Sequence, residues 1–272
     1  MLRVLFIGLY LSGFLISSHA QAVFRADETE GQRAARMQWW KDAKFGMFVH
    51  WGIYAASEGQ WKGQAFPDMR PGIEWLMCKG APGGIDVDEY VDTLAPQMTL
   101  ENFRPEEWAA LAADAGMQYF VITAKHHDGF GMVDFPGTDY DIAGRTPYGK
   151  DPMLPLSKAI RDAGLRFGLY FSQSQDWSNP GGRPSCFKGM EGDWNEYVDQ
   201  HAVPQLNHLL GGTFGPIDVL WFDSGSCTKT REGGLKIWEE LAAQPQILVN
   251  NRLKVDNLGD FDCPEQWIPP VV

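Results

Sequence analysis

The acidic residue with the most favourable setting for chemistry is Asp223. It follows the apolar, strand-forming run from Val219 to Phe222 and opens a turn of small residues, Ser224 to Ser226. A carboxylate in this place sits at the carboxyl end of a buried strand, where a turn glycine lets a ligand approach. Trp221 shares its strand face because it lies two residues back. A single acid at such a position is more often a helix cap. Whether Asp223 has a functional role therefore depends on which residues follow the other strands.

Polar residues also follow the other segments whose composition predicts strands. These segments span residues 45–50, 119–124, 166–172 and 246–250. The polar residues at or just past the five strand ends are His50, His126, His127, Ser172, Asp223 and Arg252. The carboxyl ends of parallel strands meet at one face of an α/β fold, and that face holds the active site of a barrel. We therefore expect these side chains to converge.

Helical patterns separate the predicted strands. They span residues 29–42, 105–115, 156–163, 194–210 and 232–243, with a kink expected at Pro204. Helices and apolar strands that alternate at this spacing predict a parallel α/β fold. We interpret it as a (β/α)8-type, TIM-like barrel, because no glycine-rich phosphate motif of a doubly wound sheet follows the first strand. Residues 52–104, with helical patches at 74–77 and 88–94, are expected to form a functional loop system over one face.

The composition is that of a globular protein, and its charge argues against nucleic acid as a partner. The 272 residues are 44% hydrophobic and 21% charged, with a formal net charge of −12. Binding to phosphates requires a concentrated basic face, which this sequence lacks. Eleven tryptophans and thirty glycines suit stacking against a carbohydrate, although core packing explains most tryptophans in most proteins.

The first 22 residues have the features of a signal peptide. Arg3 precedes an apolar run from Val4 to Ile16, and small residues after it offer cleavage sites. The run is short for a membrane span, and no other segment approaches the roughly 20 apolar residues that a span needs. We expect a secreted or periplasmic protein with no membrane segment in its mature form and a catalytic domain over residues 23–272. An uncleaved anchor is the alternative.

The converging residue types fit the hydrolysis of a glycosidic bond. That reaction usually uses two carboxyl groups, one as nucleophile or base and one as acid. Asp223 is the candidate nucleophile, and Arg252 at a neighbouring strand end can keep a carboxylate ionised.

Four stretches of the chain resemble the α-L-fucosidases of glycoside hydrolase family 29. They read WKDAKFGMFVHWG at 40–52, TAKHHDGF at 123–130, FGLYFS at 167–172 and LWFD at 220–223. The resemblance covers residues 36–267, and the HWG and KHHDGF motifs together are specific. It implies an exo-acting, retaining enzyme that removes terminal α-L-fucose from glycans through a covalent glycosyl-enzyme intermediate, with no cofactor. The implied partner is a fucosylated oligosaccharide or glycoconjugate, and a homo-oligomer is compatible with the sequence.

The resemblance also implies roles for individual residues. Asp223 corresponds to the nucleophile, and Arg252 to an arginine of the family's Asn-x-Arg motif. The implied binding residues for fucose are His50, Glu74, Trp75, His126, His127, Tyr170, Trp221 and Arg252. Tyr170 and Phe171 are adjacent, and the sequence leaves open which of them faces the pocket.

The acid/base is assigned to Glu265, with Glu74 in reserve. Residues 260–265 resemble the acid/base segment of one branch of the family, in which the position of this residue varies. The alternative for Glu265 is an ordinary surface residue beside Pro264.

The chain departs from the family pattern in two places. Met132 and Val133 stand where relatives often have Trp or Phe, which affects contacts to the group beyond fucose. Relatives also continue past Val272 through the last strands and a C-terminal β-sandwich. We therefore expect a barrel that is incomplete at its C-terminal end and lacks the sandwich, and the alternative function is a catalytically inactive, carbohydrate-binding barrel fragment.

The histidines also allow a metal interpretation, which we do not favour. His50, His126 and His127 could supply three ligands, but barrel metallohydrolases normally carry His-x-His on the first strand, and this one does not. On an extended segment His126 and His127 point in opposite directions, so we expect at most one of them to face the sugar. The other is expected to bond backbone or a carboxylate such as Asp128.

Overall fold

A five-stranded parallel sheet organises the molecule. The computed structural model describes residues 28–65, 72–182, 192–224, 230–242, 244–256 and 258–264, so the expected signal peptide and Glu265 lie outside the described residues. The strands, in their order across the sheet, are β1 (Met47–Val49), β4 (Tyr119–Lys125), β5 (Arg166–Phe171), β6 (Val219–Phe222) and β7 (Leu248–Val249). The parallel α/β prediction is confirmed. Within the described residues β1 and β7 are the two edges of the sheet, and closure into a barrel stays a prediction.

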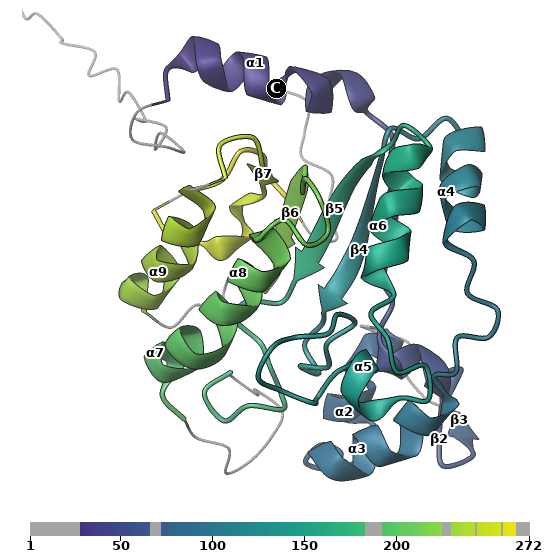
Figure 1. Ribbon diagram of the computed structural model, residues 1–272. Coiled ribbons are helices and arrows are strands. Elements are labelled where there is room, and N and C mark those ends of the chain that lie inside the picture. Colours follow the sequence, from purple (N-terminus) through teal and green to yellow (C-terminus); the bar gives the residue numbers. More distant parts are fainter. Residues whose placement is uncertain are drawn as a thin grey trace, which may run out of the picture.

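Helices connect the strands and cover them, as Figure 1 shows. The helices that lead into the next strand are α4 (Pro105–Asp114) before β4, α6 (Met153–Asp162) before β5, α7 (Trp194–Tyr197) and α8 (Val203–Leu210) before β6, and α9 (Arg231–Ala242) before β7. Helix α1 (Glu30–Ala43) precedes β1 and lies across the end at which the strands begin. Its start is fixed by a capping box, in which Thr29 and Gln32 each bond the other's backbone N–H.

The structure differs from the sequence prediction at several boundaries. Helix α6 begins at Met153 rather than at residue 156, and β7 has two residues instead of five. The expected kink takes the form of a π-helical turn, Val198–Ala202, between α7 and α8. Pro204 has no N–H to bond the preceding turn, and a widened turn accommodates that loss.

The loop system of residues 52–104 is more regular than expected. It contains α2 (Leu76–Lys79), α3 (Val87–Leu94) and an antiparallel hairpin of β2 (Gln60–Trp61) and β3 (Gln64–Ala65). In Figure 1 these elements and α5 (Ile142–Arg145) lie beyond the end toward which β4 and β5 point. The hairpin and α5 are too short to produce a periodic pattern in the sequence.

Neighbouring residues of β5 face different cores. Phe171 belongs to the main apolar core between sheet and helices, whereas Tyr170 packs with Val121 and Val219 on the opposite face. Trp39, Trp40 and Trp221 are partly buried against this second cluster. Because strand residues alternate in direction, the choice that the sequence left open is resolved in favour of Tyr170.

Lys125, the last residue of β4, is a fully buried cation that joins the core to the loop after β5. Its Nζ lies 3.0 Å from Asp176 Oδ2, 3.0 Å from Tyr197 Oη and 2.9 Å from Gln205 Oε1. It also lies 4.5 Å from the centre of the Phe171 ring. These partners satisfy the ammonium group, and the Asp176 carboxylate raises the pKa of Lys125 against the effect of burial.

Replacing Lys125 by methionine should lower the free energy of unfolding by about 3–5 kcal/mol, because Asp176 would remain as an unpaired buried charge. Urea denaturation followed by tryptophan fluorescence measures this change. The control is Lys158→Met, since Lys158 pairs with Asp162 in an exposed i,i+4 bridge worth about 0.5 kcal/mol or less. Equal effects of the two substitutions would contradict the role given to Lys125.

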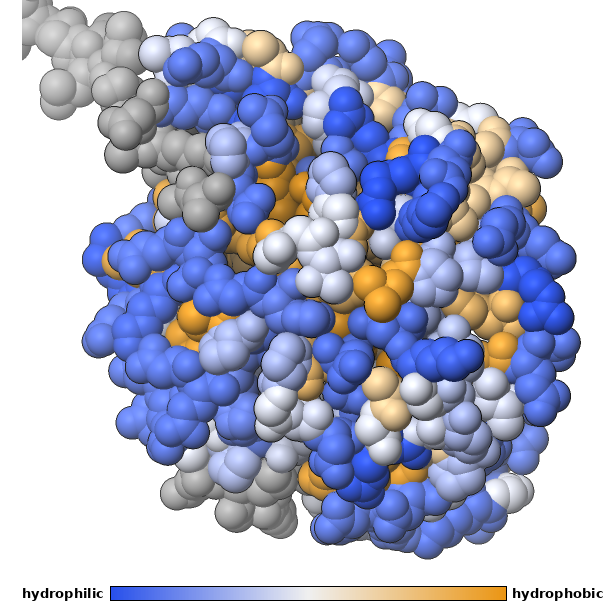
Figure 2. Space-filling view, viewed as in Figure 1, coloured by the Kyte–Doolittle hydropathy of each residue, from blue (hydrophilic) through white to orange (hydrophobic). Residues whose placement is uncertain are grey.

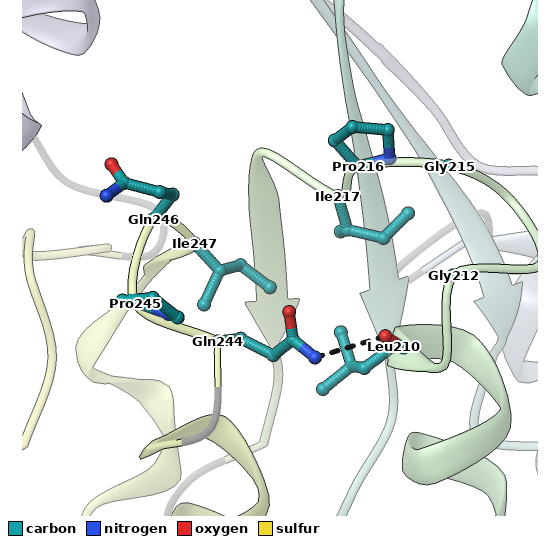
Figure 3. A pocket seen from close by; sticks show the side chains of 9 residues that line it. All are labelled: Leu210, Gly212, Gly215, Pro216, Ile217, Gln244, Pro245, Gln246 and Ile247. Atoms are coloured by element: carbon teal, nitrogen blue, oxygen red, sulfur yellow. Dashed lines mark hydrogen bonds between the residues drawn. The ribbon is translucent and has the colours of Figure 1, made fainter.

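A cavity of about 470 Å³ lies at the end of the sheet where β6 and β7 begin. Its lining residues come from the end of α8 and from the loops before these strands, as Figure 3 shows, and the Gln244 side chain donates to the Leu210 carbonyl at 3.1 Å. Figure 2 shows a mostly hydrophilic face on which apolar residues gather mainly below α1. The cavity contains none of the expected site residues. Among the helices that the structure describes, none is long and apolar enough to cross a membrane.

Candidate active site

The Asp223 carboxylate is the centre of a polar cluster at the carboxyl ends of the strands. Its Oδ1 accepts hydrogen bonds from Arg252 Nη2 and from the backbone N–H of Ser224, both at 2.6 Å. Its Oδ2 accepts one from the Tyr170 hydroxyl at 2.7 Å and lies 3.6 Å from His127 Nε2. Oδ2 therefore has the freer lone pairs of the two oxygens.

Secondary structure places each of these groups. Asp223 follows β6, and Tyr170 on the adjacent strand β5 is paired in register with Trp221. Arg252 lies in a short 3-10 helix, Asn251–Leu253, that begins just past β7. Asn250 ties the two segments together, because its side chain bonds the backbone N–H and carbonyl of Phe222 at 3.0 and 2.9 Å. The ion pair of Asp223 and Arg252 thus rests on neighbouring strand ends.

His50 and His126 extend the cluster toward β1. The His126 ring stacks on Tyr170 with centroids 5.1 Å apart and an interplanar angle of 5°. The His50 ring lies 5.6 Å from the rings of both residues. The sequence prediction that His50, His126 and Tyr170 converge beside Asp223 is confirmed as a matter of geometry.

The expectation that His126 and His127 diverge is wrong. Their ring centroids are 4.2 Å apart, and ligand atoms of both lie within 4.8 Å of Asp223. Strand β4 ends at Lys125, and residues 126–129 form a turn closed by a 3.1 Å hydrogen bond from Gly129 N to the His126 carbonyl. The alternation of an extended chain does not hold in a turn, so both rings can face one side.

Asp128 also has partners other than the expected histidine. Its carboxylate accepts from the Tyr90 hydroxyl at 3.0 Å and from Phe130 N at 3.2 Å. Burial raises the pKa of Asp128 to about 7. Among the described residues, the side chain of Asp128 therefore holds the turn through Tyr90 and Phe130.

The histidines are neutral at physiological pH. Burial is the largest cause that lowers the pKa of His50 and His126, and it lowers the pKa of His127 to about 3. Burial and the Asp223 carboxylate hold the pKa of Tyr170 well above its usual value, so the phenol keeps its proton. The cluster in direct contact with Asp223 therefore combines its carboxylate and the Arg252 guanidinium with neutral hydrogen-bonding groups.

The long loop contributes Glu74 and Trp75. The Trp75 ring packs 5.5 Å from His127 and 5.1 Å from Trp177. Glu74 lies close enough to His50 for its charge to oppose the lowering of the His50 pKa. Its carboxylate also rests on Gly72, where an added Cβ would come within 2.2 Å of Oε2, so a side chain there would displace it.

Trp221 lies on the same face but packs against aromatic rings rather than against Asp223. Its ring is 5.0 Å from Phe48 and 5.5 Å from Phe261. The Phe48 ring also lies 4.9 Å from the His50 ring, measured between centroids. Trp221 therefore packs behind His50 through Phe48.

A polar loop directly after β5 was not predicted from the sequence. Gln173, Ser174 and Gln175 are buried, and each bonds the segment that carries Asp223. Gln173 Oε1 accepts from Asp223 N at 2.9 Å, and Ser174 Oγ donates to the Ser224 carbonyl at 2.9 Å. A consecutive polar run after a strand, Ser172 to Asp176, was the available signal, since polar residues are buried only where they are satisfied.

A metal ion fits this cluster poorly. His126, His127 and Asp223 have suitable ligand atoms. However, Arg252 already neutralises the carboxylate, and both ring nitrogens of His127 have hydroxyl partners, Ser172 Oγ and Ser224 Oγ. A cation would have to displace these groups and lie beside a guanidinium. The donor set suits an uncharged ligand with several hydroxyl groups.

Known proteins with similar sequences and structures are α-L-fucosidases. Tissue alpha-L-fucosidase of Rattus norvegicus is 29% identical over 249 residues, which cover 85% of this chain and 51% of that protein. A structure of the alpha-L-fucosidase from Lactobacillus casei in complex with alpha-L-fucose is 30% identical with a TM-score of 0.73, covering 86% of this chain and 75% of that one. The enzyme from Vibrio sp. strain EJY3 is 32% identical with a TM-score of 0.73, covering 80% and 38%.

The chain spans about half the length of the curated relatives that it matches. A family model described as Alpha-L-fucosidase matches residues 14–272. With nearly the whole sequence matched, this chain belongs to the alpha-L-fucosidase family.

Proposed function

We propose that the protein is an exo-acting, retaining α-L-fucosidase that hydrolyses terminal α-L-fucosyl linkages of glycans. The observation that carries this proposal is the setting of Asp223, with Oδ1 held by Arg252 and Oδ2 facing the neutral histidines. An ionised carboxylate that is held in place and open on one oxygen is suited to attack an anomeric carbon. Membership of the family and the fucose complex of the Lactobacillus casei relative support the same substrate.

The reaction proceeds in two steps. Asp223 Oδ2 attacks the anomeric carbon, the bond to the leaving-group oxygen breaks, and the acid/base delivers a proton to that oxygen. Water, deprotonated by the same acid/base, then attacks the fucosyl ester and releases fucose with retained configuration. The assignment of Glu265 as acid/base, with Glu74 in reserve, remains part of the proposal.

Binding of the sugar falls to the neutral groups around the carboxylate. His50, His126 and His127 surround Asp223 from two strand ends, and they can exchange hydrogen bonds with hydroxyl groups without carrying a charge. Trp75, which is only partly buried, adds aromatic surface of the kind on which sugar rings stack. An oxocarbenium-like transition state gains positive charge, and the Asp223 carboxylate stabilises that charge directly.

The proposals on the signal peptide, the catalytic domain and the barrel rest mainly on the sequence. We propose that residues 1–22 are a signal peptide that directs export, and that residues 23–272 belong to a catalytic domain built as a (β/α)8-type barrel. The parallel order β1-β4-β5-β6-β7 and the gathering of the site at the carboxyl ends support the barrel.

The direct test is release of p-nitrophenol from p-nitrophenyl α-L-fucoside by the purified chain. We expect hydrolysis of this compound and none of its β-anomer or of the α-D-galactoside. Proton NMR of the first product should show α-fucose before mutarotation. Binding of fucose without any release would instead favour the alternative, a carbohydrate-binding barrel without catalysis.

A further inference from the structure

The buried loop after β5 determines the positions of hydrogens around His127. Ser172 and Gln173 are 0% exposed and Gln175 is 4% exposed, so water does not compete for their hydrogen bonds. The donors and acceptors of this loop are distinct chemical groups, and their roles can be assigned one after another.

The indole nitrogen of Trp177 can only donate a hydrogen bond. Trp177 Nε1 lies 2.9 Å from the Gln175 side-chain oxygen, which fixes the orientation of that amide. The Gln175 Nε2 group therefore faces the Ser224 hydroxyl, to which it donates at 2.7 Å. Since Ser224 Oγ accepts this bond, its own hydrogen is free for another acceptor.

That acceptor is His127. Its Nε2 lies 3.2 Å from Ser224 Oγ and 3.6 Å from the Asp223 carboxylate oxygen, which cannot donate when it is ionised. An unprotonated Nε2 accepts the hydrogen bond from the Ser224 hydroxyl, so both groups have a partner.

The hydrogen bond at His127 Nδ1, on the opposite side of the ring, independently indicates the same tautomer. Ser172 Oγ lies 2.8 Å from the backbone carbonyl of Gln175, which cannot donate, so the Ser172 hydrogen points there. Ser172 Oγ can then only accept from His127 Nδ1, 2.7 Å away. The proton of the neutral ring is therefore on Nδ1.

We propose that Gln175, acting through Ser224, is a positioning residue that holds His127 as the tautomer protonated on Nδ1, with Nε2 presented beside Asp223 as an acceptor. If the proposed function holds, a fucose hydroxyl at this point donates to Nε2 in place of Ser224. The 3.2 Å separation makes that exchange easy, because it is long for a bond from a hydroxyl. The site would then select a free hydroxyl over a methoxy or deoxy group.

The surroundings of His127 are consistent with a neutral ring. Burial is the largest cause that opposes protonation, followed by the nearby His50 and by the cations Arg252 and Lys125, whereas the Asp223 carboxylate, 3.6 Å away, favours it. The result is a pKa of about 3 for His127. Over the usual range of assays the ring should not titrate.

Nitrogen-15 NMR of the labelled protein tests the tautomer without reference to catalysis. The His127 signals are identified by their loss in His127→Asn, and the chain has six histidines to distinguish. We expect a protonated Nδ1 and a bare Nε2 that stay unchanged between about pH 5 and 8. A protonated Nε2 in the unsubstituted protein would overturn the proposal.

Gln175→Glu is the decisive variant because the shape is kept and the donor is lost. The carboxylate draws the Ser224 hydrogen away from Nε2 and places a negative charge two hydrogen bonds from the ring. The His127 pKa should rise, so that the ring gains a proton as the pH falls through about 7 to 5. Hydroxyl binding should weaken in that range, and kcat/KM for the fucoside should fall about 10- to 100-fold, mainly through KM.

Two further variants complete the test. Gln97→Glu changes the same group on the exposed surface and should leave both the spectrum and the pH profile as they are. Ser224→Ala removes only the bridging hydroxyl and should shift the Nε2 signal even if Gln175→Glu does not fold. An unaltered His127 spectrum in folded Gln175→Glu or in Ser224→Ala contradicts the proposal. If the protein does not hydrolyse the fucoside but His127 is protonated on Nδ1, the proposed function is rejected and the inference about the tautomer stands.

Discussion

Asp223→Ala should reduce kcat for p-nitrophenyl α-L-fucoside by at least about 10⁴-fold, the scale seen when a nucleophile is removed from a hydrolase. The carboxylate forms the covalent bond in the proposed first step, and the other described groups around it are neutral histidines, a tyrosine and an arginine. None of these can replace it. Initial rates under saturating substrate measure the loss.

Added azide sharpens this experiment. In Asp223→Ala a small anion can enter the space left by the carboxylate and attack the anomeric carbon, giving a β-fucosyl azide with inverted configuration. Asp199→Ala is the matched control, because Asp199 is exposed and pairs only at the surface with Lys236. It should keep full activity. Wild-type rates in Asp223→Ala would eliminate Asp223 as the nucleophile.

Glu265→Ala should separate the two acid/base candidates. Loss of general acid catalysis should slow hydrolysis of a fucosyl disaccharide by about 10²- to 10⁴-fold, with a smaller loss for an activated aryl fucoside whose leaving group needs no proton. Azide should restore the rate with the aryl fucoside and give an α-fucosyl azide, because the second step then needs no base. Rates with both substrates, with and without azide, provide the measurement.

Glu74→Ala is the comparison variant. Glu74 lies beside His50, so its removal should weaken binding and raise KM without making the rate dependent on azide. Rescue of Glu74→Ala by azide, with an unresponsive Glu265→Ala, would exchange the two roles.

Much of this arrangement could be predicted from the sequence because it follows from the alternation of strands and helices. Each of the five expected strands exists, and the polar residues past their ends do meet. The pairing of Asp223 with Arg252 followed from their places on neighbouring strand ends. The period of the apolar residues is visible in a sequence, and the alternation of helices and strands indicates that the strands run parallel.

The parts that the sequence did not predict depend on local turns and on satisfied polar groups. The direction of His127 is set where β4 ends at Lys125, a boundary that is uncertain by about two to four residues from sequence alone. The loop from Ser172 to Gln175 shows no apolar period, and its role emerges only when its partners just past β6, Asp223 and Ser224, are in place. Tertiary hydrogen bonds of this kind have no signature in a single strand or helix.

The bonds between the loop after β5 and Asp223–Ser224 bear on how this protein can be recombined with its relatives. Residues 172–177 supply partners to a segment that lies about fifty positions later in the chain. A chimaera with a crossover between β5 and β6 would take the loop from one parent and Ser224 from the other. Crossovers placed before β5 or after Ser224 keep both halves of the contact together, and libraries built on this fold should be divided there.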